Sequence, residues 1–254
     1  MKSSAPKPFK KIITSLLLVC LLLLVSFYKT TALETTAYHY SIRAFGIGFA
    51  NCILKESIKD NTITLSVNAR SKSLASLLYS VDNTYTTEIS LETNEPLKQD
   101  KLINGKHFEN LFSASPPGFL NEDSVFTETI SPPHTLFSIF RMLSVVKPAA
   151  TITVSAVSCN TSWLVTITPE DPIDYTFHNA VKKTRVYMLT FKSTDSHEVL
   201  KKRYDDILDK ELFWNSGKLQ CIVDETEPFM YEARLISASP EVSITLKDIK
   251  QEKD

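Results

Sequence analysis

The chain has little cysteine, and its few cysteines form no motif. Of the four cysteines in 254 residues, Cys20 lies in an apolar N-terminal run, which leaves Cys52, Cys159 and Cys221. None of these is spaced as a Cys-x-x-Cys pair, so a zinc knuckle and a thioredoxin-type motif are excluded. The sequence leaves open whether two of these three cysteines form a disulfide. The simpler interpretation is that they are small apolar side chains in strands.

The sequence also lacks an excess of basic residues. All 29 acidic residues lie at Glu34 or later, whereas five of the 28 basic residues precede it. The chain beyond residue 33 therefore carries 23 basic residues and a net charge of about −6. A nucleic-acid-binding domain normally shows the opposite balance, so a nucleic acid is not expected as a partner.

No catalytic or cofactor motif stands out. Gly46-x-Gly48 lacks the third glycine and the following helix of a phosphate-binding loop. Ser144 and Lys147 have the Ser-x-x-Lys spacing of penicillin-recognising enzymes, but Pro148 stops the helix at once and no Lys-Thr-Gly follows. We therefore expect a non-enzymatic protein with no cofactor and no metal.

One acidic segment keeps a hydrolase as the alternative. Asp171, Asp174 and His178 lie within eight residues, close enough to form an acid–base or metal site. Residues 169–174 contain two prolines and three carboxylates, a composition typical of an exposed turn between strands. The turn is the favoured interpretation.

The N-terminal segment predicts export. Four lysines precede an uncharged, mostly apolar run of 16 residues (12–27), the layout of a secretory signal or a membrane anchor. We expect residues 1–33 to be a signal peptide or an N-terminal membrane anchor, with cleavage left open. Residues 36–250 are then a single β-rich domain outside the cytoplasm. Lipid modification of Cys20 is disfavoured because the apolar run continues past it.

Strand patterns dominate the rest of the chain. Ile63, Leu65 and Val67 alternate with polar residues, as in a sheet with one solvated face. Residues 38–50 read as one strand that bends at Gly46 and Gly48, where the bulky side chains change sides. Further strands are expected at residues 79–91, 125–130, 151–157, 162–168, 185–192, 218–223, 229–236 and 242–246.

Two short helices interrupt these strands. Residues 133–146 carry apolar side chains at helical spacing after a cap at Ser131, and residues 196–209 show a weaker pattern. The sequence therefore predicts a mainly β fold: a curved antiparallel sheet, half-barrel or barrel-like, with one or two short helices.

Aromatic residues crowd the middle of the chain. Most should belong to the core, but some are candidates to line an apolar cleft, since a curved sheet with a helix across it often leaves one. The candidate ligand-binding residues are Phe112, Phe119, Leu136 and Phe140. If the helix lies across the open side of the sheet, Phe112 or Phe119 should be near it, and the cleft should measure several hundred Å³, as ligand pockets do.

Several segments also resemble a family of exported bacterial proteins, catalogued as domain of unknown function thirty-one hundred and eight. They are residues 45–50 (FGIGFA), 70–85 (RSKSLASLLYSVDNTY), 136–141 (LFSIFR) and 228–235 (PFMYEARL). The chain departs from the family at Trp214, which is not followed by acidic residues, and at the helix expected near residues 196–209.

This resemblance covers about Tyr38 to Ile236. It implies a protein of the periplasm or cell envelope, anchored in the inner membrane if the leader is not cleaved. It also implies a curved antiparallel sheet and no known reaction. Together with the export signal and the aromatic residues, it predicts a binding protein for a lipid or other hydrophobic ligand, or for another envelope protein. A hydrolase and a purely structural, membrane-tethered domain are the alternatives.

Overall fold

Antiparallel strands and one short helix make up the described part of the chain. The computed structural model describes residues 34–44, 47–72, 81–103, 105–121, 126–129, 131–158, 161–194, 218–236 and 242–253. The elements before the helix are β1 (Glu34–Ala44), β2 (Ile47–Lys59), β3 (Thr62–Ser71), β4 (Asp82–Ser90), β5 (Pro96–Ile103), β6 (Lys106–Ala114), β7 (Pro117–Asn121) and β8 (Phe126–Glu128). The helix α2 (Leu136–Val145) is followed by β9 (Ile152–Ser158), β10 (Thr161–Glu170), β11 (Asp174–Phe177), β12 (Ala180–Ser193), β13 (Lys218–Asp224), β14 (Met230–Leu235) and β15 (Val242–Lys253).

All the strands that the structure describes belong to one continuous antiparallel sheet. Its order is β8-β7-β6-β5-β4-β3-β2-β1-β15-β14-β13-β12-β10-β9, with β11 paired to β12. Most neighbours in the sheet are also neighbours in the sequence, as expected of hairpins. Two pairs are exceptions. β10 pairs with β12 rather than with β11, and β1 pairs with β15, the last described strand, from Glu34↔Lys253 to Ala44↔Val242. The predicted curved antiparallel sheet is confirmed.

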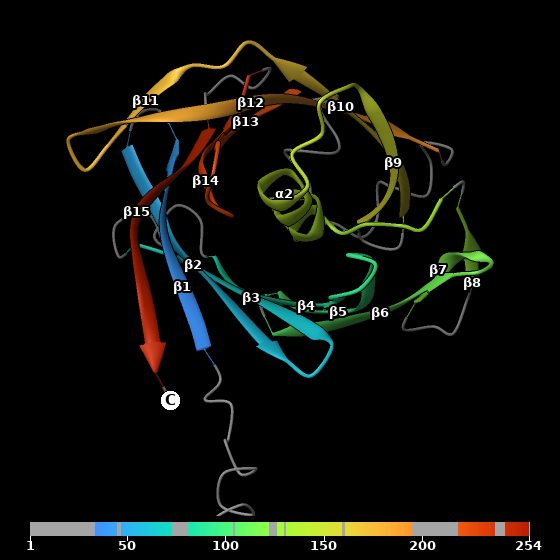
Figure 1. Cartoon of the computed structure of the whole chain (residues 1–254). Helices are drawn as coiled ribbons and strands as arrows, with labels where there is room; N and C mark the ends of the chain where they lie inside the picture. Colours follow the sequence, from blue (N-terminus) through green and yellow to red (C-terminus); the bar gives the residue numbers. More distant parts are fainter. Residues whose placement is uncertain are drawn as a thin grey trace, which may run out of the picture.

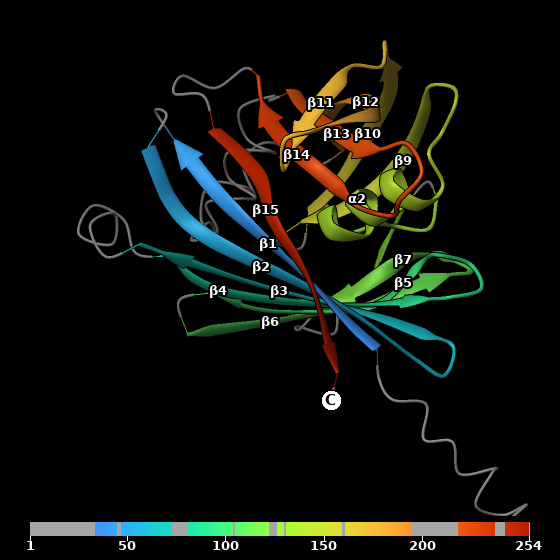
Figure 2. The same cartoon turned by 60° about the vertical axis from the view of Figure 1, so that its left-hand side comes forward.

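The sheet bends into two limbs that enclose α2. Strands β1 to β8 form the first limb and β9 to β14 the second, and β15 connects them by pairing with β1 and β14 (Figures 1 and 2). Register shifts interrupt the pairing at Ile42/Arg43, His39/Tyr40 and Ile222/Val223. Such irregularities bend a strand and increase its twist. One apolar core fills the space between the limbs and α2.

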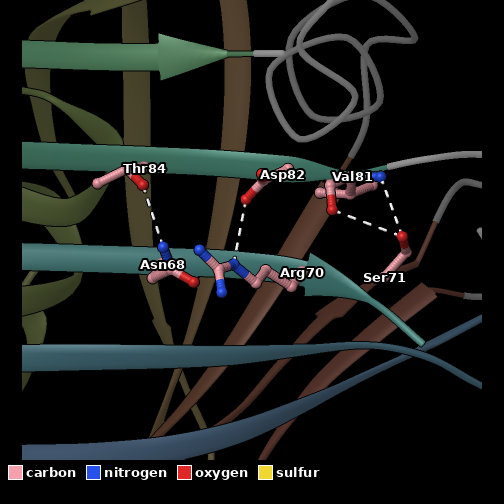
Figure 3. A network of polar contacts seen from close by, with 6 residues as sticks. All are labelled: Asn68, Arg70, Ser71, Val81, Asp82 and Thr84. Carbon is pink, nitrogen blue, oxygen red and sulfur yellow. Dashed lines mark hydrogen bonds and ion pairs between the residues drawn. The ribbon is translucent and has the colours of Figure 1, made fainter. Parts of the chain in front are cut away.

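The outer face of β3 and β4 shows the predicted alternation. Val67 and Ala69 are buried, whereas the intervening side chains form cross-strand pairs on the solvated face. Asn68 Nδ2 donates to Thr84 Oγ1 (3.1 Å) and Arg70 Nε to Asp82 Oδ1 (3.1 Å), as Figure 3 shows. The two-residue period therefore identified this buried face correctly.

The predicted strand over residues 38–50 is two strands, which corrects the sequence interpretation. β1 and β2 pair antiparallel, from Thr35↔Ser57 to Ala44↔Ile47, so the chain reverses between Ala44 and Ile47. Ile42 of β1 and its partner Ala50 of β2 are both buried, whereas Ile47 beside the reversal is 71% exposed. A Cβ on Gly48 would meet only the flexible end of Lys72, with Nζ at 2.8 Å. Gly46 lies outside the described residues, as does the helix predicted at residues 196–209.

Helix α2 forms where its apolar spacing predicts, with a different cap. The N-cap is Thr135, whose side-chain oxygen accepts a hydrogen bond from Ser138 N (3.1 Å). In return, Ser138 Oγ accepts a hydrogen bond from Thr135 N (2.9 Å), which completes a capping box. Ser131, the predicted cap, instead bonds Ser155 of β9 through its backbone N–H and its hydroxyl. The segment before α2 thus lies against the edge of the second limb.

Candidate functional site

An apolar cavity of about 60 Å³ lies between α2 and the first limb. Strands β1 to β3, one face of α2, Ile244 of β15 and the segment before β14 form its walls. The aromatic side chains among its lining are Tyr38, Tyr40, Phe137, Phe140 and Phe229. Because protein interiors normally pack without voids, this cavity is the candidate site.

The helix presents two rings to this cavity because of its spacing. Phe137 and Phe140 meet edge to face with centroids 6.2 Å apart, and Phe137 also lies 5.1 Å from the ring of Tyr85 on β4. Such aromatic pairs add to the free energy of simple apolar burial. The face of α2 toward the cavity is therefore fixed by packing against the first limb.

The segment that carries Phe229 is held in place by one buried carboxylate. Asp224 Oδ1 accepts hydrogen bonds from Thr226 N (2.8 Å) and Glu227 N (2.7 Å), and its Oδ2 accepts from the hydroxyl of Tyr231 (2.6 Å). Burial alone would raise the pKa of Asp224, but these hydrogen bonds outweigh it and hold the pKa below its usual value.

The end of α2 supports the same segment. Lys147 Nζ donates to the carbonyl oxygens of Glu225 (2.9 Å) and Glu227 (3.2 Å). Ser144 Oγ donates to the carbonyl of Phe140 (3.0 Å) inside the helix. The Ser-x-x-Lys spacing therefore serves helix and loop contacts, and the two side chains do not form a nucleophile–base pair.

Two charged residues stand in the otherwise apolar lining. Arg141 of α2 and Glu56 of β2 both border the cavity, with Nη2 and Oε1 3.5 Å apart and side chains 11% and 19% exposed. Neither residue was predicted from the sequence as a site residue. The available signal was a charge at Arg141 between Phe140 and Met142, inside an apolar helix.

Cys52, which lines the cavity, does not supply an ionised nucleophile. Burial raises the pKa of Cys52 to about 12, so its thiol stays protonated at neutral pH. Cys52 and Cys221 are both free and buried, which agrees with the interpretation of cysteines as small core side chains. Cys159 lies outside the described residues.

Of the four predicted ligand-binding residues, only Phe140 lines the cavity. Leu136 is buried in the core but does not belong to the cavity lining. Phe112 and Phe119 are cross-strand partners on β6 and β7, and neither belongs to the lining. The cavity is also smaller than the several hundred Å³ that we expected.

The acidic segment of the alternative hydrolase does not gather into a cluster. Asp174 Oδ1 pairs with Lys183 Nζ (2.9 Å) on the exposed β11–β12 hairpin, and His178 forms its turn with φ of 47°. Among the described residues, no group of three or more histidine, cysteine or acidic side chains is placed to hold a metal. The exposed-turn interpretation describes this segment.

The comparisons add no family to these observations. Neither a protein-family model nor a curated protein matches the chain. Among the residues that the structure describes, no helix is both long and apolar enough to cross a membrane. The fold defines the chain as a curved, open antiparallel sheet that encloses a helix, and the resemblance to the exported bacterial family stays a prediction.

Proposed function

We propose that the chain is a non-enzymatic, exported protein of the bacterial envelope that binds a hydrophobic ligand between α2 and β1 to β3. The cavity beside Phe140 is the observation that carries this proposal, since its lining is almost wholly apolar. The lysine-flanked apolar run at residues 12–27 supports export.

The cavity volume limits how a ligand fits. About 60 Å³ is less than the roughly 300 Å³ or more of drug-sized ligand sites. It accommodates the end of an acyl chain or a small apolar group. A longer chain requires α2 to shift from the first limb. The ligand end therefore lies against Tyr40 and Phe140, where the void already exists.

The test compares two substitutions of Cys52 in protein prepared from its own host. Cys52→Leu adds two heavy atoms to the cavity wall and is expected to lower the retained ligand at an unchanged or higher melting temperature, because it fills a void. Cys52→Ala enlarges the void and is the matched control, expected to retain ligand. Native mass spectrometry measures the bound mass. Absence of any bound mass on the wild type, together with no uptake of added fatty acids, would contradict the proposal.

A further inference from the structure

The cavity wall contains an arginine with incomplete hydrogen bonding. Arg141 Nη1 donates to Asn94 Oδ1 at 2.8 Å, whereas its buried Nε has no hydrogen-bond partner. The contact from Nη2 to Glu56 is 3.5 Å long, compared with about 2.7 to 2.9 Å for a good charge-assisted hydrogen bond. One edge of the guanidinium is therefore poorly satisfied by the protein itself.

That edge has the geometry for one kind of ligand group. The Nε and Nη2 donors of an arginine form a planar fork that matches the two oxygens of a carboxylate. Glu56 occupies this edge only at long distance, and its 19% exposed side chain can turn toward solvent. An incoming carboxylate would then replace a weak contact with two short ones.

Relying on the function proposed above, we propose that the ligand is an anionic amphiphile whose carboxylate binds Arg141 and whose single acyl chain enters the apolar cavity. Tyr38 lines the same cavity and supplies a further donor, because its hydroxyl stays protonated. Burial, followed by the negative charge of Glu56, raises the pKa of Tyr38 to about 12.

Glu56 also sets the charge that the ligand can carry. Arg141 and Glu56 together are neutral, so a bound carboxylate leaves one net negative charge in a partly buried site. A dianionic phosphate leaves two, which a low-dielectric environment disfavours more strongly. The site therefore favours a carboxylate over a phosphate, and removal of the Glu56 charge should strengthen carboxylate binding.

The experiment measures calorimetric binding of decanoic acid, decanol and decyl phosphate to the full-length protein after lipid removal on a hydrophobic resin. The acid is expected to bind at least about tenfold more tightly than the alcohol, as for a charge-assisted hydrogen bond. Arg141→Gln should remove this preference. Glu56→Gln should raise affinity for the acid and leave that for the alcohol unchanged. Arg70→Gln, which breaks the exposed pair with Asp82 (Figure 3), is the matched control.

Each other outcome is decisive. Equal binding of acid and alcohol, or a preference that persists in Arg141→Gln, would overturn the anionic assignment and leave hydrophobic binding intact. Tighter binding of decyl phosphate than of the acid would overturn the choice of carboxylate. Binding of none of the three would overturn both proposals. If Arg141→Gln fails to fold, the relative affinities of the wild type for the acid and the alcohol, together with the effect of Glu56→Gln, still test the proposal.

Discussion

Single side chains determine how firmly the cavity wall is held. Asp224 accepts three backbone or hydroxyl hydrogen bonds from residues 226–227 in addition to that of Tyr231, and it is only 5% exposed. A buried carboxylate with this many donors is stabilised in its charged form. Its folded pKa is lowered from 3.8, so its contribution to stability is complete above the unfolded pKa and is lost as the pH falls through the folded pKa.

Asp224→Asn is expected to lower the free energy of unfolding at pH 7 by roughly 1 to 3 kcal/mol, because hydrogen bonds to a charged group are lost. The difference from the wild type should shrink below about pH 4, where Asp224 of the unfolded chain begins to take up a proton, and continue to shrink as the pH falls toward the lower folded pKa. Urea unfolding between pH 3 and 7 measures it. Asp82→Asn, at an exposed ion pair, is the control, and a pH-independent difference at Asp224 would refute the charge-based explanation.

Two glycines should respond differently to the same substitution. A Cβ on Gly118 would lie 2.5 Å from the backbone oxygen of Thr127 and 2.5 Å from Phe126 Cζ, so Gly118→Ala should cost about 1 kcal/mol as β8 is displaced. Gly48→Ala should cost less, since the Lys72 side chain can move away. Equal losses in chemical denaturation would show that close backbone contact does not decide the cost.

At the scale of elements, α2 depends on its first turn and on its two neighbours. The capping box satisfies backbone N–H groups that the helix itself leaves unpaired. Its residues Leu136, Ile139 and Leu143 are buried between the limbs. Because α2 carries Phe140 and Arg141, a change in its start alters the cavity as well as the stability of the helix.

Thr135→Ala is expected to destabilise the protein by roughly 1 kcal/mol, the usual cost of losing an N-cap side chain. Thr135→Ser keeps the hydroxyl and should recover most of this loss. Thermal unfolding of both variants, measured beside the wild type, provides the comparison. If the alanine and serine variants lose the same amount, the side-chain hydrogen bond to Ser138 contributes nothing and the cost is one of packing.

At the scale of the whole molecule, β15 holds the two limbs together. It pairs with β1 along almost its full length and with β14 from Glu232↔Thr245 to Leu235↔Val242. Without it, β1 and β14 would both become edges of separate sheets with exposed hydrogen-bonding groups. The single core between the limbs would open as well.

Deletion of residues 242–254 is therefore expected to abolish cooperative unfolding of the entire domain rather than to fray one edge. The loss of cooperative unfolding should appear as a missing calorimetric transition and as fast amide hydrogen exchange in both limbs. Disruption of an edge strand of the same sheet, by Phe126→Pro in β8, is the control and should leave the transition in place. Retained protection of β9 to β13 in the deletion variant would indicate two independently stable limbs.

Local patterns in the sequence were enough for most of the strands and for α2. The alternation of Ile63, Leu65 and Val67 predicted which face is buried, and the apolar spacing predicted the helix, because both signals depend on neighbouring residues. The reversal near Gly48 was missed because the same alternation fits one bent strand or two paired ones. The apolar spacing of α2 predicted which face of the helix is buried, but not which strands pack against that face.

Only the tertiary structure decided where the cavity lies and which residues line it. The pairing of Glu34 with Lys253 connects residues more than 200 positions apart, and no local pattern encodes it. The same long-range geometry brings Arg141 to Glu56 and separates Phe140 from Phe112 and Phe119. The sequence by itself determined the elements, since these depend on local periodicity, whereas the site depends on the curvature of the whole sheet.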